Sequence, residues 1–244
     1  MQETQTQGRH SGRLFPFLGP LLGRALALGF AGLVSGAAHA GDRPYLATTT
    51  ATSEPDDDNV WAMDTVVQRL GGLNNALINA EYAFDPLTTV QLSAARSREQ
   101  QGLSVEFKRL FNNYAREDWG WGLSIELGAS KAEGLRWRGG DVAVTLPLSW
   151  KVSNAIVLHA SVGLEKERGQ ERERVLATAA EWAFTRQGTL FAELARVGEA
   201  TQAQLGLRWW LKREKLAVDI AAVRSRADGS TERGFVLGLT LQDL

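Results

Sequence analysis

The sequence predicts an all-β protein: an antiparallel transmembrane β-barrel of about twelve strands that follows a cleaved signal peptide. Two observations predict it. Segments of about ten residues alternate apolar with polar side chains, and turn residues separate these segments. The stretch "GLRWWLKREKLAVDIAAV" at 206–223 shows both, because two alternating runs flank the charged tetrapeptide "KREK". In a barrel the apolar face of each strand contacts lipid and the polar face lines the lumen.

The composition restricts the function classes. The chain has 244 residues, a net charge of −1 and no cysteine. A near-neutral charge argues against a nucleic-acid partner, since such proteins carry a basic excess. Without cysteine there is no disulfide framework, zinc–thiolate site or cysteine nucleophile. Of the three histidines, His10 and His39 lie in the N-terminal leader, so neither a metal site nor a cofactor is expected.

The first 40 residues predict a signal peptide, residues 1–40. A basic segment precedes the apolar stretch 25–37, and "AHA" at 38–40 provides a small-residue cleavage site. The alternative is a membrane anchor. Arg24 interrupts the apolar span, however, and the uninterrupted part is shorter than the ~20 residues that a spanning helix needs. The mature chain is therefore expected to be exported, with the bacterial outer membrane as its location.

The mature chain divides into two parts. Residues 41–58 are rich in Thr, Pro and Asp and predict an irregular periplasmic lead-in, whereas 59–244 predict the barrel. Twelve is an even number, as in single-chain bacterial barrels, and ten is the alternative count. The segment 173–185 also has helix-favouring residues, but its alternation favours a strand. The predicted strands are 59–70, 75–85, 88–98, 102–114, 119–131, 140–152, 155–166, 173–185, 189–198, 202–212, 215–225 and 232–243.

The aromatic residues favour a barrel over a soluble periplasmic β-sandwich, which would show the same alternation with its apolar face turned inward. If both termini are periplasmic, most tryptophans fall at the periplasmic rim and only Trp137 at the other. Aromatic rings suit a membrane interface because they are apolar with a polar edge. The predicted membrane-interface aromatics are Trp61, Tyr82, Phe84, Trp119, Trp121, Trp150, Trp182 and Trp209, with Trp210 assigned to the same rim.

The same topology predicts unequal connections. Short turns are expected on the periplasmic side, and longer, charged loops on the outer side at 131–141, 165–174 and 226–234.

The polar faces predict an acidic lumen. Acids outnumber bases there, which would favour cations if water passes through. The alternative is a barrel filled by its own side chains, with the carboxylates paired to Arg and Lys. The predicted lumen-lining residues are Asp64, Glu81, Glu106, Lys108, Glu126, His159, Glu165, Glu181, Glu193, Arg208 and Asp219.

A catalytic set is not expected. His159 and Ser161 lie two residues apart on one strand face, and this pair resembles outer-membrane phospholipase A, in which such residues perform acyl-ester hydrolysis. The next strand offers no Asn at a matching place, and the pair points inward, whereas that lipase acts at its lipid face. A lipid-modifying enzyme is therefore the distant alternative, and no catalytic residue is assigned.

Several segments together resemble a group of small bacterial outer-membrane β-barrels, some of them described as transporter-like. These segments are "GDRPYLATTTA", "VWAMDTVVQR", "EDWGWGLSIELG" and "QLGLRWWL". The resemblance implies the fold and the location. It also implies insertion by the barrel assembly machinery, which usually reads a terminal aromatic residue; this chain instead ends in "LQDL".

The expected function is a narrow channel or transporter-like pore for small solutes or ions. The alternative is a structural or interaction barrel with a filled lumen. Its expected partners are outer-membrane lipid and lipopolysaccharide or a partner protein at the outer loops, and no oligomeric state is assigned. The basic residues of these loops that could pair with phosphates are Arg136, Arg138, Lys166, Arg168, Arg172, Arg174 and Arg233.

Overall fold

The computed structural model describes residues 60–98, 100–112, 114–132, 134–213 and 215–242. The predicted signal peptide at 1–40, the lead-in at 41–58 and the last two residues of the C-terminal "LQDL" lie outside these ranges. Within them, no helix is long and apolar enough to cross a membrane.

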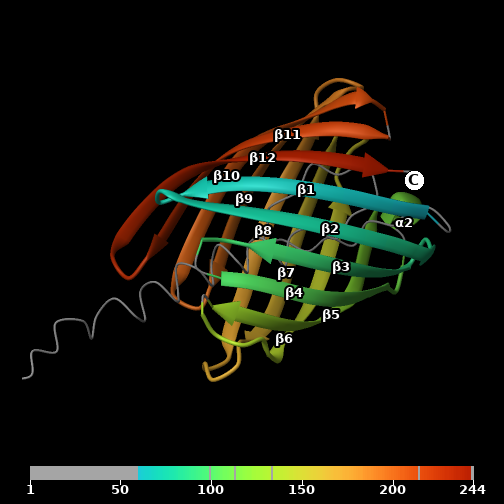
Figure 1. Cartoon of the computed structure of the whole chain (residues 1–244). Coiled ribbons are helices and arrows are strands. Elements are labelled where there is room, and N and C mark those ends of the chain that lie inside the picture. Colours follow the sequence, from blue (N-terminus) through green and yellow to red (C-terminus); the bar gives the residue numbers. More distant parts are fainter. Residues whose placement is uncertain (1–59, 99, 113, 133, 214, 243–244) are drawn as a thin grey trace, which may run out of the picture.

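Twelve antiparallel strands close into a barrel in which each strand pairs with its neighbours along the chain and β1 pairs with β12 (Figure 1). The prediction of twelve strands is confirmed, and the alternative of ten is wrong. A short helix, α2 (Tyr114–Glu117), lies between β4 and β5. The strands are β1 (Val60–Leu70), β2 (Leu73–Asp85), β3 (Thr88–Arg96), β4 (Gln100–Leu110), β5 (Trp119–Ala132), β6 (Arg138–Lys151), β7 (Ile156–Lys166), β8 (Glu173–Ala183), β9 (Gly188–Val197), β10 (Ala200–Lys212), β11 (Leu216–Ala227) and β12 (Ser230–Gln242).

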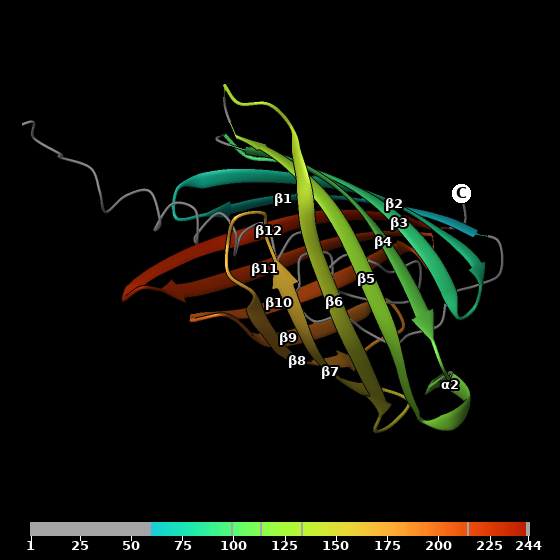
Figure 2. The same cartoon turned by 90° about the horizontal axis from the view of Figure 1, so that it is seen from below.

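The strands cross the barrel wall obliquely, as Figure 2 shows, which is what closure of a sheet requires. Residues 173–183, with a composition that also suits a helix, form strand β8 and pair with both β7 and β9. Pairing on both sides satisfies the backbone groups of β8, so the barrel overrides the local helix propensity.

The apolar face of every strand points outward. On β10, for example, Leu205 is 62% exposed and Trp209 is 40% exposed, whereas Gln204 and Arg208 are 4% and 1% exposed. A soluble sandwich would bury its apolar face, so this arrangement excludes that alternative. Each strand contributes to the apolar exterior, with Met63, Ile78, Leu92, Val105, Ile125, Leu146, Leu158, Leu176, Leu194, Leu205, Ile220 and Leu237 among the exposed side chains.

The barrel has two unlike ends. The tryptophan end is the one at which β1 begins and β12 ends, and α2 lies there (Figure 1). Its connections are 86–87, 111–118, 152–155, 184–187 and 213–215. The opposite end is called the arginine end, and its connections are 71–72, 97–99, 133–137, 167–172, 198–199 and 228–229.

The predicted contrast between short turns and long loops is wrong. Residues 226–234, expected to form a loop, are mostly strand, with a turn at Asp228 and Gly229. Both turn residues have positive φ, 48° and 79°, as a type I′ hairpin turn requires. At the tryptophan end, by contrast, residues 111–118 form an extended connection that includes α2. Longer connections at the arginine end are confined to 133–137 and 167–172.

Closure between β1 and β12 depends on a close backbone approach at Gly234. A Cβ added there would overlap the carbonyl oxygen of Arg69 and would lie 2.8 Å from the Cα of Leu70. Both atoms belong to backbone, so the neighbour cannot move aside without shifting the seam between the first and last strands.

We therefore expect Gly234→Val to impair closure of the barrel, with a loss of stability of at least roughly 1–3 kcal/mol from overpacking. The measurement is the midpoint of heat-induced mobility change on gels, made on protein refolded in detergent. Gly139→Ala is the matched control, because its added Cβ would meet no atom closer than 3.9 Å. Equal midpoints for Gly234→Val and the native chain would contradict the argument.

Candidate functional site: the barrel interior

The structure places the predicted lumen residues on the inward face of their strands. Glu165, near the arginine end of β7, is half-buried. The others are each 9% exposed or less: Asp64, Glu81, Glu106, Lys108, Glu126, His159, Glu181, Glu193, Arg208 and Asp219. That these side chains line a conducting lumen remains a prediction.

A buried ion pair joins β10 and β11 on one side of the interior. Arg208 donates from Nε to Oδ1 of Asp219 at 2.7 Å and from Nη2 to Oδ2 at 2.9 Å. Nη2 also donates to the hydroxyl of Thr240 on β12 at 3.0 Å. A bidentate pair fixes both side chains, and burial makes each dependent on the other.

Trp210 is part of this interior group. Its side chain is 4% exposed, and its ring centroid lies 5.4 Å from the guanidinium carbon of Arg208. Trp210 therefore lies at the predicted end of the barrel but on the inner face of the wall, because strand alternation places Trp209 outside and Trp210 inside. A cation over the ring face adds to the contacts that hold the guanidinium of Arg208.

A second polar group spans β6, β7 and β8. His159 Nδ1 lies 2.8 Å from the hydroxyl of Ser149, and Nε2 lies 3.0 Å from Oε1 of Glu181. Both ring nitrogens are thus engaged without Ser161, whose hydroxyl is buried and has no partner among the described residues. The predicted resemblance to a lipase rested on His159 and Ser161, and the structure does not join them.

Ser149, His159 and Glu181 do have the order of a serine–histidine–acid triad. The hydroxyl of Ser149 belongs to a residue that is 0% exposed, however, and His159 is 3% exposed. An ester would have no access to that hydroxyl. We therefore describe the three as a structural hydrogen-bond group that fixes the orientation of the imidazole.

On the opposite wall, carboxylates predominate. The hydroxyl of Ser124 on β5 donates to Oε1 of Glu106 on β4 at 2.6 Å. Glu126 lies directly across the strand pair from Glu106, and Lys108 is the buried cation of this wall. Acids therefore exceed bases in the described interior, which is the physical basis of an acidic lining.

Several interior polar atoms have no protein partner among the described residues. They include both amide atoms of Asn79, both amide atoms of Gln204, Oε1 of Gln91 and Nη1 of Arg208. Buried polar groups are nearly always hydrogen-bonded, to protein or to water. These groups are compatible with a lumen that holds water and unfavourable in a dry, close-packed core.

The mouth at the arginine end is acidic. A pocket of about 570 Å³ opens there, lined in part by Glu126, Asp141, Glu165 and Glu167. Glu167 lies in the connection after β7. Burial raises the pKa of the Glu167 carboxyl, and the neighbouring carboxylates of Asp141 and Glu173 raise it further. The negative charge of this mouth therefore depends on pH.

The mouth at the tryptophan end is basic. A pocket of about 1210 Å³ opens there, and Lys151, Arg186 and Arg213 are among its lining residues, with Trp210 and Glu181 deeper on its wall. The two ends of the barrel thus present opposite charge to a solute that enters. The sequence prediction treated the lumen as uniformly acidic and did not separate the mouths.

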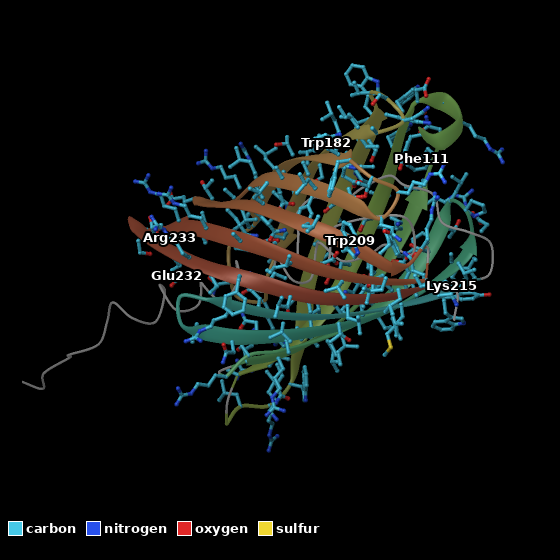
Figure 3. All side chains as sticks on the ribbon, turned by 90° about the horizontal axis from the view of Figure 1, so that it is seen from above. Phe111, Trp182, Trp209, Lys215, Glu232 and Arg233 are labelled. Carbon is cyan, nitrogen blue, oxygen red and sulfur yellow. The ribbon has the colours of Figure 1, made fainter. Side chains whose placement is uncertain are left out.

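The predicted interface aromatics lie outside the wall at one end. Trp61, Phe84, Trp119, Trp121, Trp150, Trp182 and Trp209 are 40–58% exposed, and Tyr82 is half-buried. Neighbouring rings pack, with centroids 4.9 Å apart for Trp61 and Tyr82 and 4.4 Å apart for Phe111 and Trp121. In Figure 3, Trp182 and Phe111 lie toward the end opposite Arg233. Contact of this girdle with a lipid interface remains a prediction.

Sequence reasoning missed some interior residues. Alternation along "DVAVTLPLSW" places Asp141 and Ser149 on the inward face, so their orientation could have been predicted. The pairing of Ser149 with His159 could not, because it depends on the register between β6 and β7. In the described part of the chain, no three histidine, aspartate or glutamate side chains are arranged to hold a metal ion.

Comparison with solved structures finds porins. The "KdgM porin in complex with disordered oligogalacturonate" matches with a TM-score of 0.61 at 10% identity, covering 74% of this chain and 98% of that chain. The NanC porin matches with a TM-score of 0.56 at 10% identity, covering 73% of this chain and 98% of that chain. The outer membrane protein Omp33 of Acinetobacter baumannii matches with a TM-score of 0.53 at 9% identity, covering 76% of this chain and 98% of that chain. At such identities the likeness concerns the fold.

The closed twelve-stranded wall, the apolar exterior and the polar interior define an outer-membrane β-barrel with porin-like architecture. A comparison with curated protein sequences gives no match. The chain belongs to the family described as "Uncharacterised conserved protein UCP029691", whose profile matches residues 59–242 and therefore the whole barrel.

The buried ion pair gives a stability prediction. We expect Arg208→Met to cost roughly 3–5 kcal/mol, because it leaves the carboxylate of Asp219 buried and unpaired. The double variant Arg208→Met/Asp219→Leu should recover much of that loss, since no charge is then stranded. The measurement is denaturant unfolding followed by far-ultraviolet circular dichroism. A double variant no more stable than Arg208→Met would contradict it.

Proposed function

We propose that this barrel is a passive channel for small solutes or ions, with a hydrated, net acidic interior that favours cations. The observation that carries the proposal is the set of inward polar side chains, many of them carboxylates, of which several have atoms without a partner among the described residues. Such a lining needs water. Charged rings in a water-filled pore select for the opposite sign of ion.

The porin-like architecture supports the passage of solutes through the barrel, and the charge of the interior indicates which solutes would pass. The KdgM structure is described as a complex with oligogalacturonate, which carries a carboxylate on each sugar. The interior and the arginine-end mouth of the present barrel carry acids in excess. They would repel such a polyanion, so small cations or neutral solutes fit this chain better.

The opposite charge of the two mouths should make the current through the proposed channel depend on its direction. A cation meets carboxylates at the arginine end, whereas Lys151, Arg186 and Arg213 line the tryptophan end. An axial asymmetry of fixed charge makes ion accumulation in the pore depend on the sign of the voltage. The proposed channel should therefore pass current more readily in one direction.

The absence of enzymatic activity belongs to the same proposal. Ser149 and His159 are geometrically able to share a proton, but their burial separates them from any substrate in lipid. The role that fits them is orientation of Glu181 within the polar lining.

The decisive experiment is single-channel recording across a planar bilayer with the refolded protein. We expect discrete conductance steps, an asymmetric current–voltage curve and a reversal potential in a KCl gradient that indicates cation selectivity. Silence from protein that is β-rich and heat-modifiable would refute the channel. It would favour the alternative, an interaction barrel with a filled lumen.

The acidic mouth gives a matched test of selectivity. Glu165→Gln/Glu167→Gln should lower the cation-to-anion permeability ratio by roughly twofold or more, because two carboxylates are lost from the pore entrance. Glu117→Gln/Glu199→Gln is the control, since it removes the same charge from exposed positions outside both mouth pockets. Equal effects of the two double variants would show that local charge at the mouth is not responsible.

A pH titration gives a further test. Because the pKa of Glu167 is raised, lowering the pH should neutralise it earlier than an ordinary glutamate. Cation selectivity should therefore fall as pH decreases, beginning above the usual glutamate range, and recover as pH rises. The reversal potential measures this directly. In Glu167→Gln the early part of the change should disappear, whereas Glu199→Gln should retain it.

A further inference from the structure

A cluster of exposed arginines lies on the outer face of the barrel near the arginine end. Strand alternation points Arg69 on β1, Arg224 and Arg226 on β11, and Arg233 on β12 outward, and all four are exposed. Glu232, the neighbour of Arg233, lies on the other face of β12 by the same alternation and lies against the turn at Gly71. Figure 3 labels Glu232 and Arg233 at the arginine end.

The strand register brings these four side chains together. Arg224 and Arg233 are directly opposite each other across β11 and β12. Arg226 is two residues farther along β11 on the same face, and the backbone N–H of Gly71, two residues after Arg69, donates to the carbonyl of Arg233. Like charges directly opposite each other destabilise a strand pair unless an anion lies between them.

In the described part of the chain, two arginines form salt bridges with carboxylates, Arg109 with Asp85 and Arg208 with Asp219. None of the four clustered arginines forms a salt bridge with a described carboxylate. The outward positions beside them on β10 and β12 are Thr201, Ala203 and Thr231, none of which is charged.

The cluster lies at the edge of the apolar exterior. Phe235, directly opposite Arg69, is 46% exposed, and farther down the same strands Leu237 and Val67 are 46% and 47% exposed. Charged side chains on the lipid face are costly near the bilayer midplane and tolerated at the interface. Four guanidinium groups therefore mark the level at which the hydrocarbon region gives way to headgroups.

We propose that Arg69, Arg224, Arg226 and Arg233 form a binding site for the phosphate groups of a lipopolysaccharide headgroup. Guanidinium forks match phosphate oxygens in bidentate geometry. The opposed pair Arg224 and Arg233 accommodates one phosphate, and the two flanking arginines provide for a second. A glycolipid headgroup with more than one phosphate neutralises this cluster better than a single phosphodiester does. The site lies opposite the tryptophan end and is independent of whether the lumen conducts.

Native mass spectrometry of the refolded full-length barrel in detergent tests the site. The probes are lipopolysaccharide that bears two phosphates, the same lipid after phosphatase treatment, phosphatidylglycerol and inorganic phosphate. We expect binding of the phosphorylated glycolipid to weaken by about tenfold in Arg224→Gln/Arg233→Gln, because a charge-assisted bidentate site is lost. Phosphatase treatment should weaken binding to the native chain similarly.

The control is Arg116→Gln/Lys215→Gln, which removes two exposed positive charges from the tryptophan end, outside the mouth pocket, and should leave the affinity unchanged. Equal loss in this control, or full affinity in the Arg224/Arg233 variant, would overturn the site. Equal affinity for phosphatidylglycerol, or displacement by inorganic phosphate alone, would overturn the assignment to a glycolipid. If the glutamine variant does not fold, Arg224→Lys/Arg233→Lys retains the charge. Unchanged affinity in that variant would overturn bidentate recognition.

Discussion

The structure depends on one constraint, which is that lipid offers no hydrogen-bond partner to a polypeptide backbone. A strand in that environment must be paired along both edges, so the sheet must close on itself. The closure is made by β1 and β12, and it requires the backbone contact at Gly234 that no side chain would permit. Closure in turn gives the sheet an inside and an outside. The alternation of each strand then assigns every side chain to water or to lipid.

Once the interior is polar, its charges determine its character. Arg208 and Asp219 pair with each other on β10 and β11, whereas Glu126, Asp141, Glu165 and Glu167 line the mouth at the arginine end. Lys151, Arg186 and Arg213 line the other mouth. The two mouths therefore differ in charge, and the exterior carries a separate cationic cluster at the arginine end. The acidic mouth, the basic mouth and the outer arginine cluster thus occur on one barrel, whose fold is stabilised by backbone pairing and lipid contact.

Strand number, direction and facing could be predicted from the sequence because they follow from a period of two residues. Trp209 and Trp210 show this reasoning at work, because alternation places the first on the apolar outer face and the second on the polar inner face, where the structure has them. The turn at Asp228 and Gly229 could also be predicted, since an Asp-Gly pair between alternating strands predicts a tight hairpin. Side-chain contacts between neighbouring strands could not be predicted. The pairs of Ser149 with His159 and of Arg224 with Arg233 exist only because of register, which a single sequence does not specify.

The uneven distribution of tryptophan has a practical consequence. Of the eight tryptophans, Trp137 alone belongs to the arginine end, and six others lie on the outer wall at the opposite end. The intrinsic tryptophan emission of the folded protein therefore comes almost entirely from one end of the barrel. A water-soluble quencher added to one side of sealed vesicles would report which way the barrels had inserted, without any label. The protein carries its own marker of sidedness.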